Sequence, residues 1–188
     1  MEPLLTTFVA TALAQFGDKT QLLVMALAAV YARPAAIIAG LAVASLASSL
    51  IAATAGILIH DAITLRAAAL LVALALLYAG ATGVMTPAPP QPLAQGRTPA
   101  FLAALLYLLA SEMGHKSQFL TFALAARFDS LLLAGFGAAA GIVAANVPAA
   151  LLGHVLAERM PLRALRTAAA VLFLIGGAIV ALNALRLV

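Results

Sequence analysis

A short polar motif occurs twice in this chain, each time inside a long apolar run. The first copy reads Gln15-Phe16-Gly17-Asp18-Lys19-Thr20-Gln21, and the second, at an offset of 97 residues (112 − 15), reads Glu112-Met113-Gly114-His115-Lys116-Ser117-Gln118. Ionisable side chains in the middle of membrane-length segments are costly to insert, and they usually mark a path for ions or protons. Because the motif is duplicated, we interpret it as a functional site.

Two carboxylates, an imidazole and an amide are the groups of this motif pair that suit a cation. Positions three apart lie on one face of a helix, so Gln15 and Asp18 are predicted to point together into a bundle, as are Glu112 and His115. Oxygen ligands suit Ca²⁺ and Mn²⁺, and the imidazole favours Mn²⁺. A buried carboxylate binds either a cation or a proton, so Asp18, Glu112 and His115 are also the proton-coupling candidates. This competition is the minimal chemistry of a cation/proton antiporter.

Other polar residues in and near the motifs are candidates for supporting roles. We expect Lys19 and Lys116 each to pair with the opposite carboxylate or to turn away from the site. The remaining candidates are Thr20, Ser117, Gln21, Gln118 and the pair Ser49 and Asn146, which has the same offset of 97 residues (146 − 49). The hydroxyl groups could instead bond back to their own helix, and Ser49 and Asn146 could bridge helices rather than line a pathway.

The composition is that of a membrane protein. The chain has 188 residues, of which 65% are hydrophobic and 9% charged, whereas a soluble domain carries about 25% charged residues. No segment remains for a soluble catalytic domain, so we predict neither an enzyme nor a bound cofactor. The absence of cysteine excludes disulfides and thiolate metal ligands. The net charge of +4 is interpreted as short loops flanking a membrane rather than as a nucleic-acid-binding surface.

Six apolar stretches predict a multi-pass, all-α integral membrane protein. The predicted transmembrane helices lie at about residues 3–30, 35–59, 66–85, 100–126, 130–156 and 162–185. A Pro-rich linker at 87–99 separates a first repeat, 1–86, from a second, 100–188. Because each repeat holds an odd number of spans, the second must enter the membrane from the opposite side. The six helices are therefore predicted to form two inverted three-helix repeats, with the two motifs meeting near the midplane.

The distribution of arginines predicts the orientation of the chain in the membrane. With the N-terminus outside, the inner side holds Arg33, Arg97, Arg159, Arg163 and Arg166, and the outer side holds Arg66, Arg127 and Arg186. This excess favours both termini outside and the linker in the cytoplasm.

At the motif residues the chain resembles the Gdt-type divalent cation/proton exchangers (uncharacterised protein family 0016), whose signature is Glu-x-Gly-Asp-Lys/Arg-Thr/Ser. The matching residues are Gly17, Asp18, Lys19 and Thr20 in the first copy and Glu112, Gly114, Lys116 and Ser117 in the second. The resemblance covers essentially the whole chain, including the paired motifs and the central linker. The family includes bacterial manganese exporters and Golgi manganese/calcium transporters, and the acids of both motifs are proposed to bind the cation.

Two positions depart from the family signature. The first-motif Glu is Gln15 here, and the second-motif Asp is His115. Each motif keeps one acid, so two negative charges remain to offset a divalent cation. The resemblance implies Asp18 and Glu112 as principal ligands and proton acceptors, with Gln15 and His115 as secondary ligands. It implies export of Mn²⁺, or else Ca²⁺, in exchange for protons across the inner (plasma) membrane.

Other functions stay open on the sequence alone. One is a proton-coupled exporter of a different small solute, and another is a non-transporting membrane scaffold. An intramembrane enzyme is disfavoured because no nucleophile or cofactor motif accompanies His115 and Glu112. The predicted partners are a divalent metal ion, protons and the lipid bilayer, without nucleic acid, and homo-oligomerisation stays open.

Overall fold

The computed structural model describes residues 1–85, 98–159 and 161–186, with the side chains of 154–159 left aside. Within these ranges the chain is helical throughout and contains no strand. The helices are α1 (Glu2–Gln15), α2 (Lys19–Tyr31), α3 (Pro34–His60), α4 (Leu65–Val84), α5 (Ala100–Glu112), α6 (Lys116–Phe128), α7 (Leu131–Arg159) and α8 (Leu162–Leu185). The predicted linker lies almost wholly outside the described residues.

Among the described residues, four helices are long and apolar enough to cross a membrane. They are α3, α4, the Leu131–Gly153 part of α7, and α8. Gly153, with a φ of 44°, interrupts α7. The short apolar helices α2 and α5 are below the length of about 20 residues that a span needs. The all-helical membrane class predicted from the sequence is confirmed.

The first and fourth predicted spans are each broken at the motif, which corrects the prediction of two continuous helices. In the first, α1 ends at Gln15 and α2 begins at Lys19, and Gly17 between them has a φ of 65°. In the second, α5 ends at Glu112 and α6 begins at Lys116, and Gly114 has a φ of 72°. Positive φ is incompatible with a right-handed helix, and glycine adopts it with little steric cost. The repeated glycine therefore ends one half-helix and lets the next begin.

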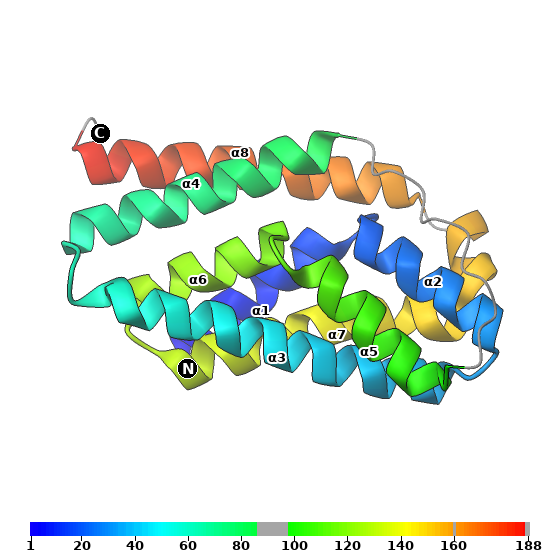
Figure 1. Ribbon diagram of the computed structural model, residues 1–188. Helices are drawn as coiled ribbons and strands as arrows, with labels where there is room; N and C mark the ends of the chain where they lie inside the picture. Colours follow the sequence, from blue (N-terminus) through cyan, green and yellow to red (C-terminus); the bar gives the residue numbers. More distant parts are fainter. Residues whose placement is uncertain (86–97, 160, 187–188) are drawn as a thin grey trace.

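The two halves of the chain interlock. Helix α1 packs along α7, and α5 packs along α3, so each first half-helix contacts the other half of the chain. Small residues permit this close approach: a Cβ on Gly40 of α3 would lie 2.7 Å from the Cβ of Ala104 on α5. Helices α4 and α8 lie side by side along one flank of this interlocked block, as Figure 1 shows.

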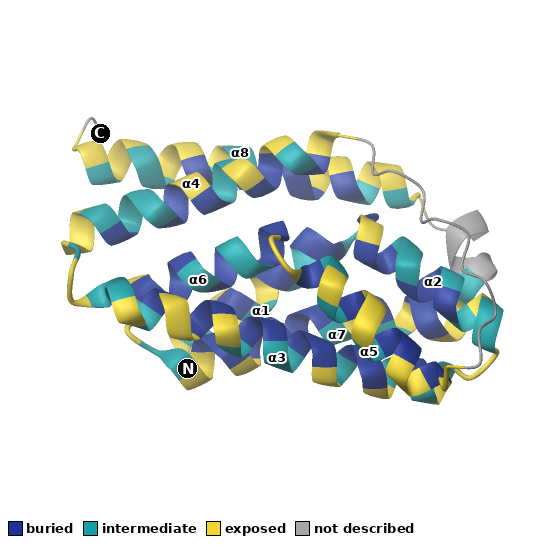
Figure 2. Cartoon of the chain, viewed as in Figure 1, coloured by how far each residue is buried: buried dark blue, intermediate teal, exposed yellow. Residues whose placement is uncertain are grey.

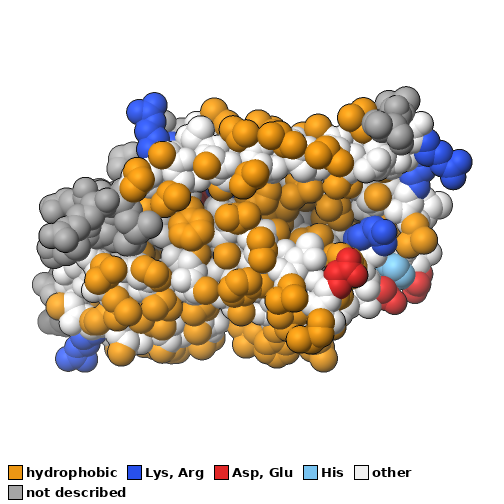
Figure 3. Space-filling model, turned by 180° about the vertical axis from the view of Figure 1, so that it is seen from behind, with side chains coloured by type: hydrophobic (Ala, Val, Ile, Leu, Met, Phe, Trp, Pro, Cys, Tyr) orange, Lys and Arg blue, Asp and Glu red, His pale blue; other side chains and the backbone are white. Residues whose placement is uncertain are grey.

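The outer surface is apolar where lipid would surround it. Figure 2 shows that the buried residues face the interior of the bundle, whereas the outer faces of α4 and α8 are largely exposed. On the face drawn in Figure 3, hydrophobic side chains cover the middle and charged side chains lie towards the two ends. Exposed residues of α8 include Leu172, Ile175 and Ile179. This distribution fits a bilayer around the middle of the molecule.

Candidate functional site

The two helix breaks bring the acid of the first motif against the second motif. His115 Nε2 lies 2.5 Å from Asp18 Oδ2, and Lys116 Nζ donates to Asp18 Oδ1 at 2.9 Å. The other imidazole nitrogen, Nδ1, lies 2.6 Å from the hydroxyl of Ser117. Asp18 is therefore held by two side chains of α6 and its N-terminal cap.

The acid of the second motif is held by the first. Glu112 Oε1 accepts hydrogen bonds from Gln15 Nε2 at 3.2 Å and from Thr20 Oγ1 at 3.0 Å. Gln15 Nε2 also lies 3.0 Å from Ser117 Oγ, and Asn146 Nδ2 donates to Gln15 Oε1 at 3.3 Å. Ser117 contacts both His115 and Gln15, so it joins the two acids into one network.

This network is buried. Gln15, Thr20, Glu112, Ser117 and Asn146 have no exposed surface, and Asp18, His115 and Lys116 are at most 9% exposed. Burying charged groups in a membrane protein costs free energy unless they are paired or serve a ligand. The structure thus gathers Gln15, Asp18, Glu112 and His115 into one place, as the motif spacing predicted, and adds Thr20, Ser117, Lys116 and Asn146 to them.

The two lysines and Ser49 have different surroundings. Lys116 is buried and pairs with Asp18, whereas Lys19 at the equivalent position is exposed and outside the network. Lys116 therefore pairs with the carboxylate of the opposite motif, and Lys19 turns away from the site, which are the two arrangements expected from the sequence. Ser49 is buried on α3, and its hydroxyl has no hydrogen-bond partner among the described residues.

The repeated glutamines hold the helix breaks. The amide N–H of Gly17 donates to Gln21 Oε1 at 2.8 Å, and the N–H of Gly114 donates to Gln118 Oε1 at the same distance. In both cases the glutamine follows its glycine by four residues and satisfies an amide that the broken helix leaves free. Gln21 and Gln118 therefore shape the backbone at the site.

Two polar residues of this region were not predicted as site residues. Ser111 Oγ lies 3.3 Å from Thr20 Oγ1, and Arg166 Nη1 donates to the carbonyl of Gly17 at 3.3 Å. The duplication gave no signal for Arg166, because the position at the same offset is Ala69 (166 − 97). A charged residue inside a predicted span was the available signal.

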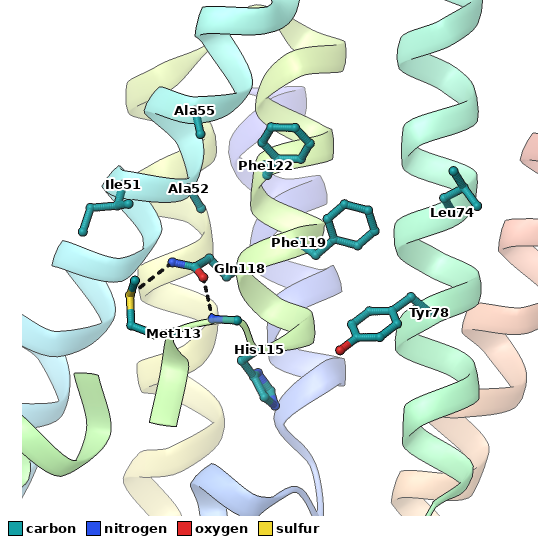
Figure 4. A pocket seen from close by; sticks show the side chains of 11 residues that line it. Ile51, Ala52, Ala55, Leu74, Tyr78, Met113, His115, Gln118, Phe119 and Phe122 are labelled. Carbon is teal, nitrogen blue, oxygen red and sulfur yellow. Dashed lines mark hydrogen bonds between the residues drawn. The ribbon is translucent and has the colours of Figure 1, made fainter. Parts of the chain in front are cut away.

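A cavity of about 760 Å³ opens onto the second helix break but not the first. In Figure 4 it lies between α3, α4 and α6, with His115 and Gln118 on its wall and aromatic side chains of α6 and α4 along it. Gly114 is exposed there, and a Cβ added to it would meet nothing within 4 Å. Gly17 is buried, and its added Cβ would lie 2.6 Å from the carbonyl oxygen of Leu162 on α8. The two equivalent breaks therefore differ in access.

This difference predicts unequal effects of one substitution at the two glycines. Both Gly17→Ala and Gly114→Ala place a Cβ at positive φ, a strain of about 1–2 kcal/mol. Gly17→Ala must also displace the first turn of α8, an overpacking cost of roughly 1–3 kcal/mol. We expect Gly17→Ala to lower the thermal unfolding temperature of the detergent-purified protein more than Gly114→Ala does. Equal shifts would contradict the tight packing of α8 on the first break.

Carboxylates and imidazole alone do not form a metal cage here. Among the described residues, no three His, Asp or Glu side chains converge as metal ligands. A cation at this site would therefore need neutral oxygen atoms of amides or hydroxyl groups in addition to a carboxylate. Mn²⁺ and Ca²⁺ both accept such oxygen ligands.

Comparisons with known proteins agree over nearly the whole chain. The family described as "Divalent cation/proton antiporter GDT1" matches residues 3–89 and 100–187. A protein of Vibrio cholerae serotype O1 named "Putative manganese exporter" is 34% identical over 177 residues, which cover 93% of this chain and 88% of that protein. No solved structure gives a significant match. The gap between the two matched segments, residues 90–99, lies within the predicted linker.

Proposed function

The chain belongs to the divalent cation/proton antiporter family GDT1, and from this membership we propose that it exports Mn²⁺ in exchange for protons. The family is one of transporters and not of enzymes. The observation that carries the proposal is the single buried network that joins Asp18 and Glu112 across the two motifs. A site that can hold either a cation or protons on these two acids supplies the coupling that exchange needs. Ca²⁺ is the second candidate cation.

The two departures from the family signature are compatible with this role. Gln15 and His115 lie directly against Glu112 and Asp18, respectively, so each remaining acid faces a side chain that can donate a hydrogen bond. The amide oxygen of Gln15 and the imidazole of His115 are also cation ligands. We propose that the imidazole favours Mn²⁺ over Ca²⁺, because nitrogen ligands suit transition ions.

We propose that the chain crosses the inner membrane six times as two inverted repeats, residues 1–86 and 100–188. In this arrangement α1 with α2, and α5 with α6, each make one broken span. Figure 1 places the start of α1 and the end of α8 at the same end of the molecule, as an even number of crossings requires. Broken helices that meet at the midplane are a common way for secondary transporters to build an ion site.

Transport of Mn²⁺ into proteoliposomes under an imposed pH gradient tests the proposal. We expect the wild type to take up Mn²⁺ only when the gradient is present, and Asp18→Asn and Glu112→Gln to abolish that uptake, because each removes one of the two acids of the network. Asp61→Asn is the matched control, since Asp61 is exposed at the end of α3, and it should transport as the wild type does.

Two results would contradict the proposal, the first by removing Asp18 and Glu112 from the site and the second by removing exchange of a divalent cation itself. One is gradient-dependent uptake that survives both acid substitutions. The other is the absence of Mn²⁺ and Ca²⁺ uptake by a folded wild type. The second result would favour a proton-coupled exporter of a small organic solute, for which the mostly apolar cavity beside His115 is the supporting observation.

A further inference from the structure

Several buried oxygen atoms near the network lack a hydrogen-bond partner among the described residues. Two of them are Oε2 of Glu112 and Oδ1 of Asn146, on side chains with no exposed surface. Buried polar atoms are nearly always hydrogen-bonded, because leaving one unpaired costs about 1–3 kcal/mol. Both residues share Gln15 as a hydrogen-bonded partner, so their two oxygen atoms offer neighbouring acceptors to an electropositive ligand.

The orientation of the two amides leaves these oxygen atoms free. Asn146 Nδ2 donates to Gln15 Oε1 at 3.3 Å and to the carbonyl of Ile142 at 2.8 Å. Turning the Asn146 amide over would set its oxygen against these two acceptors, so Oδ1 must point elsewhere. Gln15 is fixed in the same way, because its Nε2 donates to the carboxylate of Glu112. Gln15 and Asn146 thus use their N–H donors within the protein, whereas Glu112 Oε2 and Asn146 Oδ1 have no partner among the described residues.

The charges of the two acids are offset to different degrees. Asp18 has two nitrogen partners, His115 and Lys116. Glu112 accepts only from an amide and a hydroxyl, and none of the ion pairs between described residues includes it. An arriving cation therefore finds an unpaired carboxylate at Glu112, whereas at Asp18 it would have to displace a lysine.

We infer that the transported cation binds at the Glu112 end of the network, with Glu112 Oε2 and Asn146 Oδ1 as two of its ligands. The inference rests on the proposed function and adds to it a ligand from α7, outside the motifs. Hard divalent cations take a carboxylate together with neutral amide oxygens. Asn146 then has two tasks, since its Nδ2 orients Gln15 while its Oδ1 contacts the cation.

Mn²⁺ binding to the purified, full-length chain, followed by the electron paramagnetic resonance signal of free Mn²⁺, tests this assignment. Asn146→Leu removes the oxygen ligand, and we expect Mn²⁺ affinity to fall roughly tenfold or more, because ligand number and charge set the affinity of such sites. Asn146→Asp keeps an oxygen ligand and adds charge but loses the N–H donors, and we expect it to bind Mn²⁺ at least as tightly as the wild type. Asn183→Leu, at an exposed asparagine of α8, is the control and should bind normally.

The Asp variant separates a ligand from a residue that only positions Gln15. If Asn146→Asp binds as poorly as Asn146→Leu, the donor function matters and the assignment as a ligand is wrong. If Asn146→Leu folds and binds Mn²⁺ as tightly as the wild type, the assignment is also wrong while the proposed exchange stands. A wild type that binds neither Mn²⁺ nor Ca²⁺ overturns both.

Discussion

Lys116→Met is expected to destabilise the folded protein strongly, whereas Lys19→Met should leave its stability nearly unchanged. Lys116 is 4% exposed, and its ammonium group lies 2.9 Å from Asp18 Oδ1. Removing one partner of a buried ion pair leaves the other charge uncompensated, which typically costs 3–5 kcal/mol. Lys19 occupies the equivalent position of the first motif but is exposed. The two lysines therefore form a matched pair of test and control.

A double substitution separates the ion pair from the packing of the lysine chain. Asp18→Asn together with Lys116→Met removes both charges, and we expect it to recover much of the stability that Lys116→Met loses. Thermal unfolding of the purified protein, followed by circular dichroism for all variants, measures these differences. Equal destabilisation by Lys116→Met and Lys19→Met would show that the pair with Asp18 contributes nothing. A double variant no more stable than Lys116→Met would assign the loss to packing.

The sequence predicted that the two motifs would meet in one cluster, but it did not predict which residues pair across it. Gln15 contacts Glu112, and Asp18 contacts His115, and the members of each pair are 97 residues apart. Equivalent positions of the two repeats thus face each other directly. This arrangement gives a physical reason for the two departures from the family signature. Had both members of each pair been acids, each contact would set two carboxylates together, whereas here each acid meets a donor.

The helix boundaries followed the apolar pattern closely where no motif interrupts it. Helix α8 spans Leu162–Leu185, the range predicted from the sequence. The apolar pattern does not show the breaks at Gly17 and Gly114, because the apolar run continues across each motif and a glycine within a helix is tolerated. At each break, a glutamine one turn later accepts a hydrogen bond from the glycine amide, which is a local side-chain contact. Periodicity carries no information about such contacts.

The repeat predicted a symmetric arrangement, and the structure departs from it at the last helix of each repeat, α4 and α8. Helix α4 lines the cavity at Gly114 with Leu74 and Tyr78, whereas α8 covers Gly17 with its first turn. In a symmetric conformation the two helix breaks would be equally accessible, but here Gly114 is exposed and Gly17 is covered. The asymmetry is a property of the conformation, so sequence alone could not reveal it.

Arg166→Ala is expected to make the covered break at Gly17 accessible and to cover the break at Gly114, which is exposed in this conformation. Arg166 is 7% exposed, and its guanidinium donates to the carbonyl of Gly17, which links α8 to the first break. Because α4 and α8 pack on each other along one flank, we expect them to move together over the interlocked block. One whole repeat rocking against the other would instead disrupt the packing of α1 on α7 and of α5 on α3.

The absence of cysteine in the chain makes this motion measurable with single introduced thiols. Phe16→Cys and Met113→Cys occupy equivalent positions, 97 residues apart, beside the closed and the open break. Phe16 is half-buried beside Arg166, whereas Met113 is exposed and lines the cavity. In detergent, a water-soluble maleimide should therefore label Met113→Cys quickly and Phe16→Cys slowly.

Adding Arg166→Ala should reverse this order of labelling. A hydrogen bond from a charged group contributes about 1.5–3 kcal/mol, so its loss shifts the equilibrium between the two conformations by roughly 10- to 100-fold. The rate at Phe16→Cys should rise and the rate at Met113→Cys should fall, because one moving pair of helices cannot uncover both breaks at once. Arg163→Ala, at an exposed arginine of the same helix, should change neither rate. Faster labelling at both positions would mean that Arg166 only stabilises the bundle. Unchanged labelling at both positions would mean that Arg166 does not control access to either break.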